Sequence, residues 1–373
     1  MRKQLLTIMA VLALSASAAW AATGAFWGLA DPGAPLFFTD AEAISADGRA
    51  VAGAGFNPAT GNQPVRWTLM GGIQGLGYLP GGTPSTWAKA ISADGIWVAG
   101  GGEIPGGYNA WRWSAGTVME PLGDLPGGPI WSEAFGISNG GSTVVGWGQT
   151  DLGMQAFRWT SSSGMQPMPA LPSGGVPSEA RAVTPDGSVI VGGYPVWRWT
   201  QALGMQELKD AAGQSIQGRA NAVTPDGSAV AGYIYTGTET YAFLWTPARK
   251  LEVLGDLPGG LAYSEAMALS GDASRIVGYG FNAANLTEAF LWDRDHGIRS
   301  LKDALVNEYG ITNLTGWTLS WAQDITPNGL TIVGYGTNPD GQMEAWMARL
   351  PEPGTLALLA AGGLALLRRR PLA

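Results

Sequence analysis

The chain has 373 residues with 57 Gly, 24 Pro and no cysteine, which excludes disulfides, thiolate metal sites and a cysteine nucleophile. Its 21 basic and 29 acidic residues give a net charge of −8, and without the five basic residues of the two terminal segments the balance is 16 to 29, a net charge of −13. Such a balance argues against nucleic acid and against an anionic membrane surface as partners.

Residues 1–21 have the features of a secretory signal peptide. Arg2 and Lys3 precede an apolar run at 5–14, and Ala19-Trp20-Ala21 fits the small-x-small pattern of a signal peptidase site. We therefore expect export, with signal peptidase cutting after Ala21 or within a residue or two of it.

Residues 22–350 contain one unit written seven times. A typical copy, ARAVTPDGSVIVG at 180–192, contains a strand, a tight Asp-Gly turn and a second strand that ends in Gly. An apolar residue before Ser or Thr aligns the copies at intervals of 40 to 56 residues, around the size of a four-stranded propeller blade. These aligned residues are Ile44, Ile91, Ile137, Val183, Val223, Leu269 and Ile325.

The turn after the aligned residue is rich in Asp, Asn and Gly. These residues tolerate the positive φ angles of tight turns, so their repetition needs no functional explanation. We align the turns as Asp47-Gly48, Asp94-Gly95, Asn139-Gly140, Asp186-Gly187, Asp226-Gly227, a shifted Gly271-Asp272, and Asn328-Gly329.

A third strand, such as AWRWS at 110–114, follows in each copy. Period two places Trp111 and Trp113 on one face and Arg112 on the other, and packing between blades, with Arg stacked on indoles, accounts for these side chains without a ligand. Four copies then supply a fourth strand and an exit loop, as LGYLPGG at 76–82, LGDLPGG at 122–128 and 254–260, and MPALPSGG at 168–175.

Seven units of four short strands predict an all-β fold, a seven-bladed β-propeller. The seventh copy ends at residue 350 without an exit loop, and residues 26–33 resemble the missing piece. We therefore predict that residues 25–30 form the outer strand of the last blade and close the ring, which removes exposed strand edges.

Two copies are irregular. The fourth has residues 209–218 in place of the exit loop. The sixth is followed by an insertion, 302–318, in which 302–309 are expected to form about two helical turns with Leu301, Leu305 and Tyr309 on one side. We interpret this insertion as a cover for apolar surface at the rim of blades 6 and 7.

Residues 351–373 form a C-terminal targeting segment with a hydrophobic helix. Pro351-Glu352-Pro353 precedes an apolar run of 14 residues and then Arg368, Arg369 and Arg370. Because 14 helical residues cover about 21 Å of a hydrocarbon core roughly 30 Å thick, the run is a marginal anchor. The arginines would stay on the cytoplasmic side and leave the preceding chain outside the inner membrane.

This tail resembles the PEP-CTERM sorting signal of Gram-negative bacteria that make exopolysaccharide. The resemblance covers residues 351–373 and implies that an exosortase, a membrane cysteine transpeptidase, cuts near the Pro-Glu-Pro and releases the protein to the cell surface or matrix. An ordinary short C-terminal anchor is the alternative.

The repeat resembles the extracellular HAF repeat, which often accompanies such tails. The shared pattern is S-E-A-x-A-I/V-S/T-x-D-G-x-x-V-V-G, then A-F-x-W, then G-x-x-x-L-G-x-L-P-G-G, over roughly residues 25–350. The histidine that names the motif is missing, and the resemblance implies a fold and a location rather than an activity. The positions of that histidine hold Asn109, Gln155, Tyr241, Glu288 and Glu344.

Motifs for catalysis are scarce. His296 is the one histidine and is expected in a turn, so neither a Ser-His-Asp triad nor a histidine-pair metal site is predicted. The Asp-Gly turns differ from sialidase Asp boxes, which place a residue between Asp and Gly. A glycosidase needs two carboxylates facing each other across a cleft, and the spacing of the 29 acidic residues selects no pair.

One set of residues, which we call the channel-mouth residues, differs between copies and is expected to converge. They stand four residues before the aligned position, and if the first strand is innermost they crowd one mouth of a central channel. Carboxylates and indoles there suit binding of a cation or stacking on a sugar ring, and capping of local backbone amides is the alternative. The channel-mouth residues are Asp40, Trp87, Glu133, Glu179, Arg219, Glu265 and Trp321.

These patterns predict a non-enzymatic binding or structural protein of the cell surface or matrix. Exopolysaccharide is the candidate ligand, Ca²⁺ is the candidate bound ion with no other cofactor expected, and exosortase and signal peptidase are the processing partners. The C-terminal helix would contact the membrane transiently. Two alternatives stay open: a carbohydrate-active enzyme, lyase or glycosidase, with carboxylates at one propeller face, and a protein-interaction platform.

Overall fold

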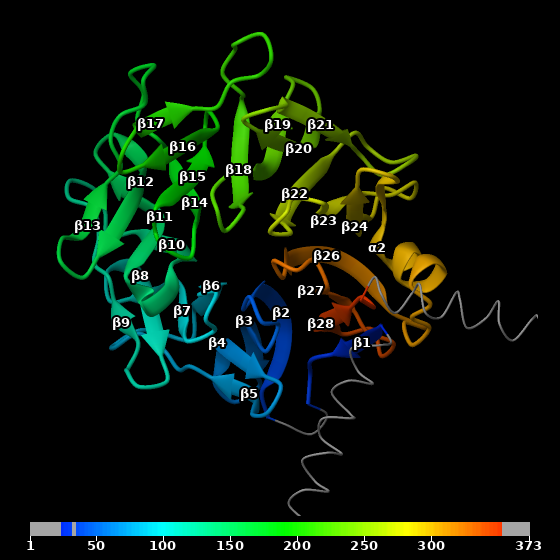
Figure 1. The fold of residues 1–373 in the computed structure, drawn as a ribbon. Coiled ribbons are helices and arrows are strands. Elements are labelled where there is room, and N and C mark those ends of the chain that lie inside the picture. Colours follow the sequence, from blue (N-terminus) through cyan, green and yellow to red (C-terminus); the bar gives the residue numbers. More distant parts are fainter. Residues whose placement is uncertain (1–23, 32–34, 353–373) are drawn as a thin grey trace, which may run out of the picture.

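The computed structural model describes residues 24–31 and 35–352, which form an all-β protein of β-propeller type. Four-stranded antiparallel sheets stand in a ring around a central axis (Figure 1). Within these residues there are five sheets of four strands and one of eight, in which a single residue pair, Gly193 with Arg219, joins β15 to β18.

The strands follow the copies of the repeat in chain order. The first sheet contains β2 (Phe37–Ile44), β3 (Ala50–Asn57), β4 (Gly61–Thr68) and β5 (Gly72–Gly75). The second contains β6 (Thr86–Ile91), β7 (Trp97–Ile104), β8 (Gly107–Ser114) and β9 (Glu120–Pro121). The third contains β10 (Ser132–Ile137), β11 (Thr143–Thr150), β12 (Gly153–Thr160) and β13 (Gly164–Pro167), with the short helix η1 (Asn139–Gly141) after β10. The eight-stranded sheet has β14 (Glu179–Val183), β15 (Val189–Gly193), β16 (Trp197–Thr200), β17 (Gly204–Glu207), β18 (Gly218–Val223), β19 (Val230–Tyr235), β20 (Thr240–Thr246) and β21 (Lys250–Gly255).

The last two sheets follow, and the second of them contains strands from both ends of the described chain. They are β22 (Ser264–Leu269), β23 (Arg275–Phe281), β24 (Thr287–Asp293) and β25 (Gly297–Ser300); and β26 (Thr318–Ile325), β27 (Thr331–Thr337), β28 (Met343–Arg349) and, from the other end of the chain, β1 (Ala25–Gly28). Each first strand ends at the apolar residue that aligns the copies of the repeat.

The third-strand aromatic side chains lie in the core between neighbouring sheets, as predicted. Trp111 and Trp113 are buried against residues of the preceding sheet. On the opposite face, the Arg112 guanidinium lies 4.3 Å from the centre of the Trp159 ring in the next sheet and donates to the Gly141 carbonyl at 2.6 Å. Indole burial and arginine stacking therefore hold adjacent sheets together.

The fourth strands lie earlier than predicted. In the first and second copies they are β5 and β9, which end before the LGxLPGG segments at 76–82 and 122–128. Those segments cross to the next sheet instead, and the leucine before their proline is buried, as Leu79 and Leu125 show. The motif is thus an exit loop anchored in the core by one leucine.

Every first strand carries a β-bulge at the same place, two residues before its end. The pairing register shifts there in all seven copies. The alanine before the bulge pairs with a second-strand glycine, such as Ala134 with Gly146. A Cβ on that glycine would lie 1.8–2.0 Å from the carbonyl oxygen of the channel-mouth residue in every copy, so the close approach requires glycine.

The turn after each first strand is fastened by a buried hydroxyl. Ser45 donates to Asp47 Oδ1 at 2.7 Å and accepts from the Ala50 amide at 3.0 Å, and Gly48 has φ 72°. The Asp of this turn is therefore structural, as the repetition indicated.

Two turns were misaligned from the sequence. The third copy places Gly140 and Gly141, both at positive φ, where other copies have Asp-Gly, and Asn139 accepts from the Asp94 amide of the preceding sheet at 3.0 Å. The sixth copy is not shifted, because Asp272 Oδ1 accepts from the Ser270 hydroxyl just as Asp47 does from Ser45. Ala273 takes the glycine position there with φ 54°.

Replacing this alanine by glycine is expected to stabilise the protein. An L-residue in the left-handed region costs roughly 1 kcal/mol, part of which glycine loses again through unfolded-state entropy. Ala273→Gly should therefore raise the free energy of unfolding by about 0.5 kcal/mol in chemical denaturation. A lower stability in the variant would show that the turn prefers alanine.

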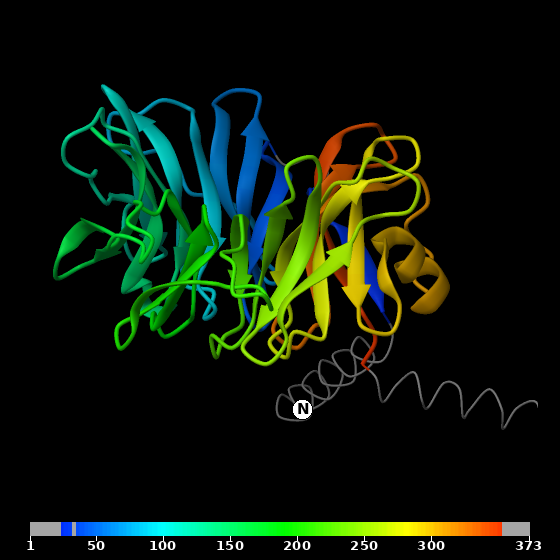
Figure 2. The same ribbon diagram turned by 90° about the horizontal axis from the view of Figure 1, so that it is seen from above.

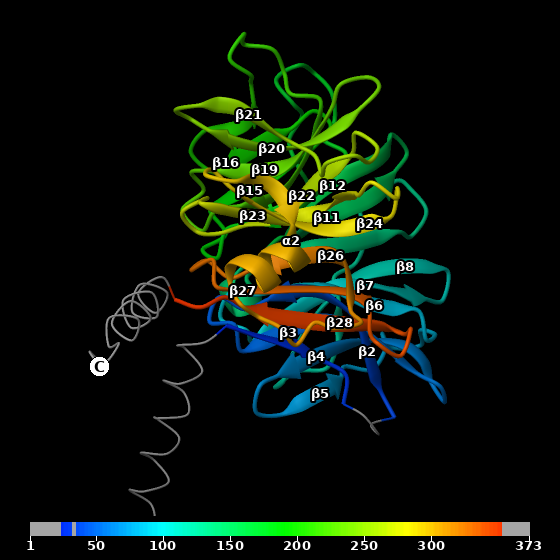
Figure 3. The same ribbon diagram turned by 90° about the vertical axis from the view of Figure 1, so that its right-hand side faces the viewer.

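The N-terminal strand and the insertion pack together on the last sheet. β1 pairs with β28 in the register Ala25 to Arg349, as its outermost strand, and is two residues shorter than the predicted 25–30. The insertion forms the predicted helical turns, α2 (Leu301–Asp303) and the π-helix η2 (Ala304–Glu308), on the outer rim (Figure 3). Leu301 and Leu305 are buried with Phe26 of β1, so the insertion covers apolar surface.

Both ends of the described chain lie on the face that carries the Asp-Gly turns (Figure 2). The Leu350 amide donates to the Leu330 carbonyl beside the Asn328-Gly329 turn, and a Cβ on Gly24 would lie 3.0 Å from Pro351. Within residues 24–31 and 35–352, no helix is long and apolar enough to cross a membrane.

Candidate functional site at the channel mouth

The channel-mouth residues lie on the seven first strands, at the end of the channel opposite the Asp-Gly turns. The structure brings them together in three groups. Trp87 donates its indole N–H to Glu133 Oε1 at 2.5 Å, Arg219 pairs with Glu179 and Glu265, and Trp321 lies beside the ring of Tyr279. Asp40 accepts the Thr39 hydroxyl at 2.8 Å, and burial raises its pKa.

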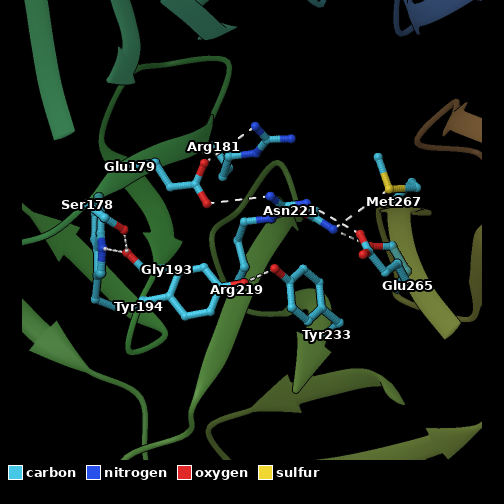
Figure 4. A network of polar contacts seen from close by, with 12 residues as sticks. Ser178, Glu179, Arg181, Gly193, Tyr194, Arg219, Asn221, Tyr233, Glu265 and Met267 are labelled. Atoms are coloured by element: carbon cyan, nitrogen blue, oxygen red, sulfur yellow. Dashed lines mark hydrogen bonds and ion pairs between the residues drawn. The ribbon is translucent and has the colours of Figure 1, made fainter. Parts of the chain in front are cut away.

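One guanidinium holds two carboxylates in what we call the Arg219 cluster, formed by Glu179, Arg219 and Glu265 (Figure 4). Arg219 Nη1 lies 3.5 Å from Glu179 Oε1, and Nη2 lies 3.3 Å from Glu265 Oε2. Its Nε donates to Asn221 Oδ1 at 2.9 Å, and its guanidinium lies 4.9 Å from the centre of the Tyr233 ring. The carboxylates are buried and ion-paired, so they are not the solvated caps of local amides offered as the alternative.

Tyrosine hydroxyls complete this cluster as donors. Tyr263 donates to Glu265, and burial together with that bond raises its pKa. Burial and the charge of Glu265 raise the pKa of Tyr279 to about 12. Both phenols therefore stay protonated over the physiological range.

Two rows of aromatic side chains flank the mouth. The first, which we call the Glu133 row, runs through neighbouring ring centres 6.0, 5.3 and 5.9 Å apart. The second lies along the last two sheets, with neighbouring ring centres 5.4, 6.1, 6.1 and 4.8 Å apart. The Glu133 row consists of Trp87, Tyr108, Trp131 and Trp147, and the second row of Phe281, Tyr263, Tyr279, Trp321 and Tyr335.

Sequence reasoning missed most of these aromatic residues, although a signal for them existed. Three of them, together with Tyr233 of the Arg219 cluster, immediately follow the repeated second-strand glycine and pair with a channel-mouth residue. Trp147 pairs with Glu133, Tyr233 with Arg219, Tyr279 with Glu265 and Tyr335 with Trp321.

A second ring of side chains, the bulge residues, lies deeper in the channel. These seven are all of different types and line a cavity of about 320 Å³ that also includes turn residues such as Pro185 and Pro327. Lys89 pairs with Glu42 at 2.7 Å, and Arg181 lies 3.9 Å over the Phe135 ring. The sequence signal was their variability at one position of the repeat. The bulge residues are Glu42, Lys89, Phe135, Arg181, Asn221, Met267 and Gln323.

Asp324 on β26 lines the same cavity and joins β26 to β2 by a hydrogen bond. Its Oδ2 accepts from the Ile44 amide and its Oδ1 from the Ile325 amide, both at 2.8 Å. Other copies have alanine or glycine at this position. Enclosure by the surrounding strands raises the pKa of Asp324 to about 7, despite the two amide donors.

A raised carboxyl pKa makes stability depend on pH. The native state holds a proton on Asp324 that the unfolded state releases at lower pH. The contribution of this proton to the free energy of unfolding is therefore complete below about pH 4 and is lost as the pH rises to about 7. Asp324→Asn, which mimics the protonated form, should therefore reduce the loss of stability over this window by about 1 kcal/mol, allowing for water in the channel. Thermal melts of the wild type and of Asp324→Asn between pH 4 and 7 measure this pH dependence. Equal pH dependence in the two proteins would contradict the prediction.

The described residues contain no group of three or more His, Asp or Glu side chains placed to hold one metal ion. His296 lies in the turn between β24 and β25, as predicted, with Nδ1 2.8 Å from Asp293 Oδ1. Of the sorting motif, Pro351 and Glu352 end the described chain. Pro353, Arg368, Arg369, Arg370 and the signal peptide 1–21 lie outside the described residues.

Solved structures show likeness in fold alone. An oligogalacturonate lyase from Vibrio parahaemolyticus is 15% identical over 88% of this chain and 98% of its own, with a TM-score of 0.55. An oligogalacturonate lyase in complex with manganese is 14% identical over 89% and 94%, with a TM-score of 0.53. TolB from Acinetobacter baumannii is 14% identical over 58% of this chain and 53% of its own, with a TM-score of 0.40. No family model matches the sequence, and no curated protein matches it.

Proposed function

We propose that this protein is an exported β-propeller that binds polysaccharide at its channel mouth, on the cell surface or in the extracellular matrix, without catalysing a reaction. The observation that carries the proposal is the convergence of the channel-mouth residues with two aromatic rows around one opening. The C–H faces of sugar rings stack on aromatic side chains, and sugar hydroxyls both donate to carboxylates and accept from guanidinium groups.

The finer architecture belongs to the same proposal. Divided at the single pair Gly193–Arg219, the eight-stranded sheet gives two four-stranded units, and with the five other sheets these match the seven copies of the repeat. The pairing of β1 with β28 supports closure of a seven-bladed ring by the N-terminal strand. The chain would then comprise a signal peptide at 1–21, the propeller at 22–350 and the sorting segment at 351–373.

The resemblance to HAF repeats and to a PEP-CTERM tail supports an extracellular location after cleavage by signal peptidase and exosortase. Since the last strand leads, through Leu350 bonded to Leu330, to the face opposite the channel mouth, a tail that holds the protein at the membrane leaves the mouth facing outward. A released form presents the same mouth to matrix polysaccharide.

Arg219→Gln tests the binding site. The change leaves Glu179 and Glu265 without their shared cation and removes donors for sugar hydroxyls, so calorimetric titration with the host exopolysaccharide should show binding weaker by roughly tenfold or more. Arg249→Gln, at an exposed arginine in the turn before β21, is the matched control and should bind normally. Equal affinities in the two variants would contradict the site. Calorimetric titration with Ca²⁺ alone tests whether the channel mouth binds this ion.

The enzyme alternative is measured in the same mixtures. A glycosidase uses a pair of carboxylates that face each other across the substrate and exchange protons, whereas Glu179 and Glu265 are each held by Arg219, and Asp40 and Glu133 bond to Thr39 and Trp87 rather than to each other. We therefore expect no new reducing ends during incubation with polysaccharide. Their appearance would favour the enzyme, and a stoichiometric protein that co-purifies would favour the interaction platform.

A further inference from the structure

Glu133 lies inside the aromatic row named after it. Trp87 on β6 donates its indole N–H to Glu133, and Trp147 on β11 pairs with Glu133 across the sheet. Tyr108 on β8 stacks on Trp131 with an angle of 29° between the rings. The partly exposed Glu133 carboxylate is thus bound by one ring of the row, and Glu133 pairs across the sheet with a second, while Tyr108 and Trp131 continue the row of rings between them.

Trp131 is an exposed member of this row and is held in place. Its side chain is 46% exposed, while its backbone amide donates to Asp124 Oδ2 at 2.9 Å. Tyr108 on one side and Trp147 on the other support its ring. A fixed, exposed indole offers a stacking surface at a low entropic cost.

The charges at the mouth favour a cation. The channel-mouth and bulge residues together have five acids and three bases, a net charge of −2. Each of the bases already pairs with a carboxylate: Lys89 with Glu42, Arg181 with Glu179, and Arg219 with Glu179 and Glu265. Among the described residues, no basic side chain forms an ion pair with Glu133: Arg181 acts on it only at longer range, and its hydrogen bond comes from the neutral Trp87 indole, so a cation can still pair with this carboxylate.

We propose that the Glu133 row binds a protonated amino sugar within a polysaccharide chain. This inference rests on the proposed function and names the class of its ligand. The ammonium group meets the Glu133 carboxylate and the faces of the surrounding rings, and the C–H face of the sugar stacks on Trp131. A uronic acid would meet net negative charge, and an N-acetylated sugar lacks the ammonium. A lysine-rich peptide carries the charge without the sugar face.

The test compares ligands of one length that differ in charge. The full protein is titrated with glucosamine, N-acetylglucosamine and galacturonate oligomers, below the pKa of the amine. We expect the glucosamine oligomer to bind at least tenfold more tightly than either of the others, and added salt to reduce the difference. Equal or tighter binding of the N-acetylated or acidic oligomer, or equal binding of a lysine-rich peptide, would overturn the inference.

Two variants place the effect at this site. Glu133→Gln keeps the size of the side chain and should abolish the preference for the charged oligomer, while Trp131→Ala, at an exposed side chain, should weaken both glucosamine-based ligands. Glu239→Gln, at an exposed glutamate on the same face, is the control and should retain the preference. A preference that survives in Glu133→Gln would contradict the site. If the host polysaccharide binds but no oligomer preference exists, this inference alone fails, whereas loss of all glycan binding refutes the proposed function too.

Discussion

A mature chain that begins after residue 31, and so lacks β1, is expected to melt roughly 10 °C below the intact protein. Phe26 is buried, packs edge-on against Trp317 with ring centres 5.1 Å apart, and stacks on Trp346 at 6.1 Å. Loss of a buried Phe side chain costs about 3–5 kcal/mol, and each kcal/mol lowers the melting temperature of a protein this large by about 2–4 °C.

Removal of β1 has a second consequence, because it exposes the edge of β28. An unpaired edge strand invites association with other chains, so the truncated protein should also aggregate more readily. Val118→Ala, at a side chain 82% exposed, serves as the control for a neutral change. An unchanged melting curve after truncation would show that the last sheet is stable with three strands and that β1 does not close the ring.

Gly146→Ala is expected to cost roughly 3 kcal/mol of folding free energy. A Cβ at this position would lie 1.9 Å from the Glu133 carbonyl oxygen and 2.9 Å from the Ala134 Cα. Both are backbone atoms, so the strand itself must move, and the cost falls at the upper end of the range for overpacking. Chemical denaturation measures the loss.

The same substitution connects the fold to the site, because the strand that must move carries Glu133. Binding by the Glu133 row should therefore weaken along with stability. Gly116→Ala is the matched control, since a Cβ there meets no atom within 4 Å and the residue has no positive φ. If Gly146→Ala were as stable as Gly116→Ala, the glycine would not be required by the bulge.

The repeat predicted the strands well because each strand has its own hydrophobic pattern. The first strands end at the aligned residues, from Ile44 to Ile325, and the alternation in AWRWS placed Trp111 in the core. Local chemistry also predicted the turns, except where glycine was followed by glycine at Gly140 and Gly141 or replaced by Ala273. There the residue types alone did not fix which position takes positive φ.

The candidate site could be predicted in part. Because Glu133, Glu179 and Arg219 occupy the same position of the repeat, the sequence predicted that they lie at the same end of the channel. The partner of each side chain depends on contacts between sheets, which the repeat does not encode. The bulge that turns Arg181 into the channel arises from pairing with a neighbouring strand, and a single strand's sequence does not encode a register. Trp131 comes from an exit loop whose path is set by the next sheet.

Oxidative footprinting with and without saturating host exopolysaccharide tests binding at the channel mouth most directly. Trp131 is exposed beside the mouth, and Met70 is 95% exposed in the β4–β5 turn on the opposite face. We predict that polysaccharide protects Trp131 from oxidation and leaves Met70 unchanged, and that protection of Trp131 in Arg219→Gln requires roughly tenfold more polysaccharide. Equal protection of Met70, or none at Trp131, would contradict a binding site at this mouth.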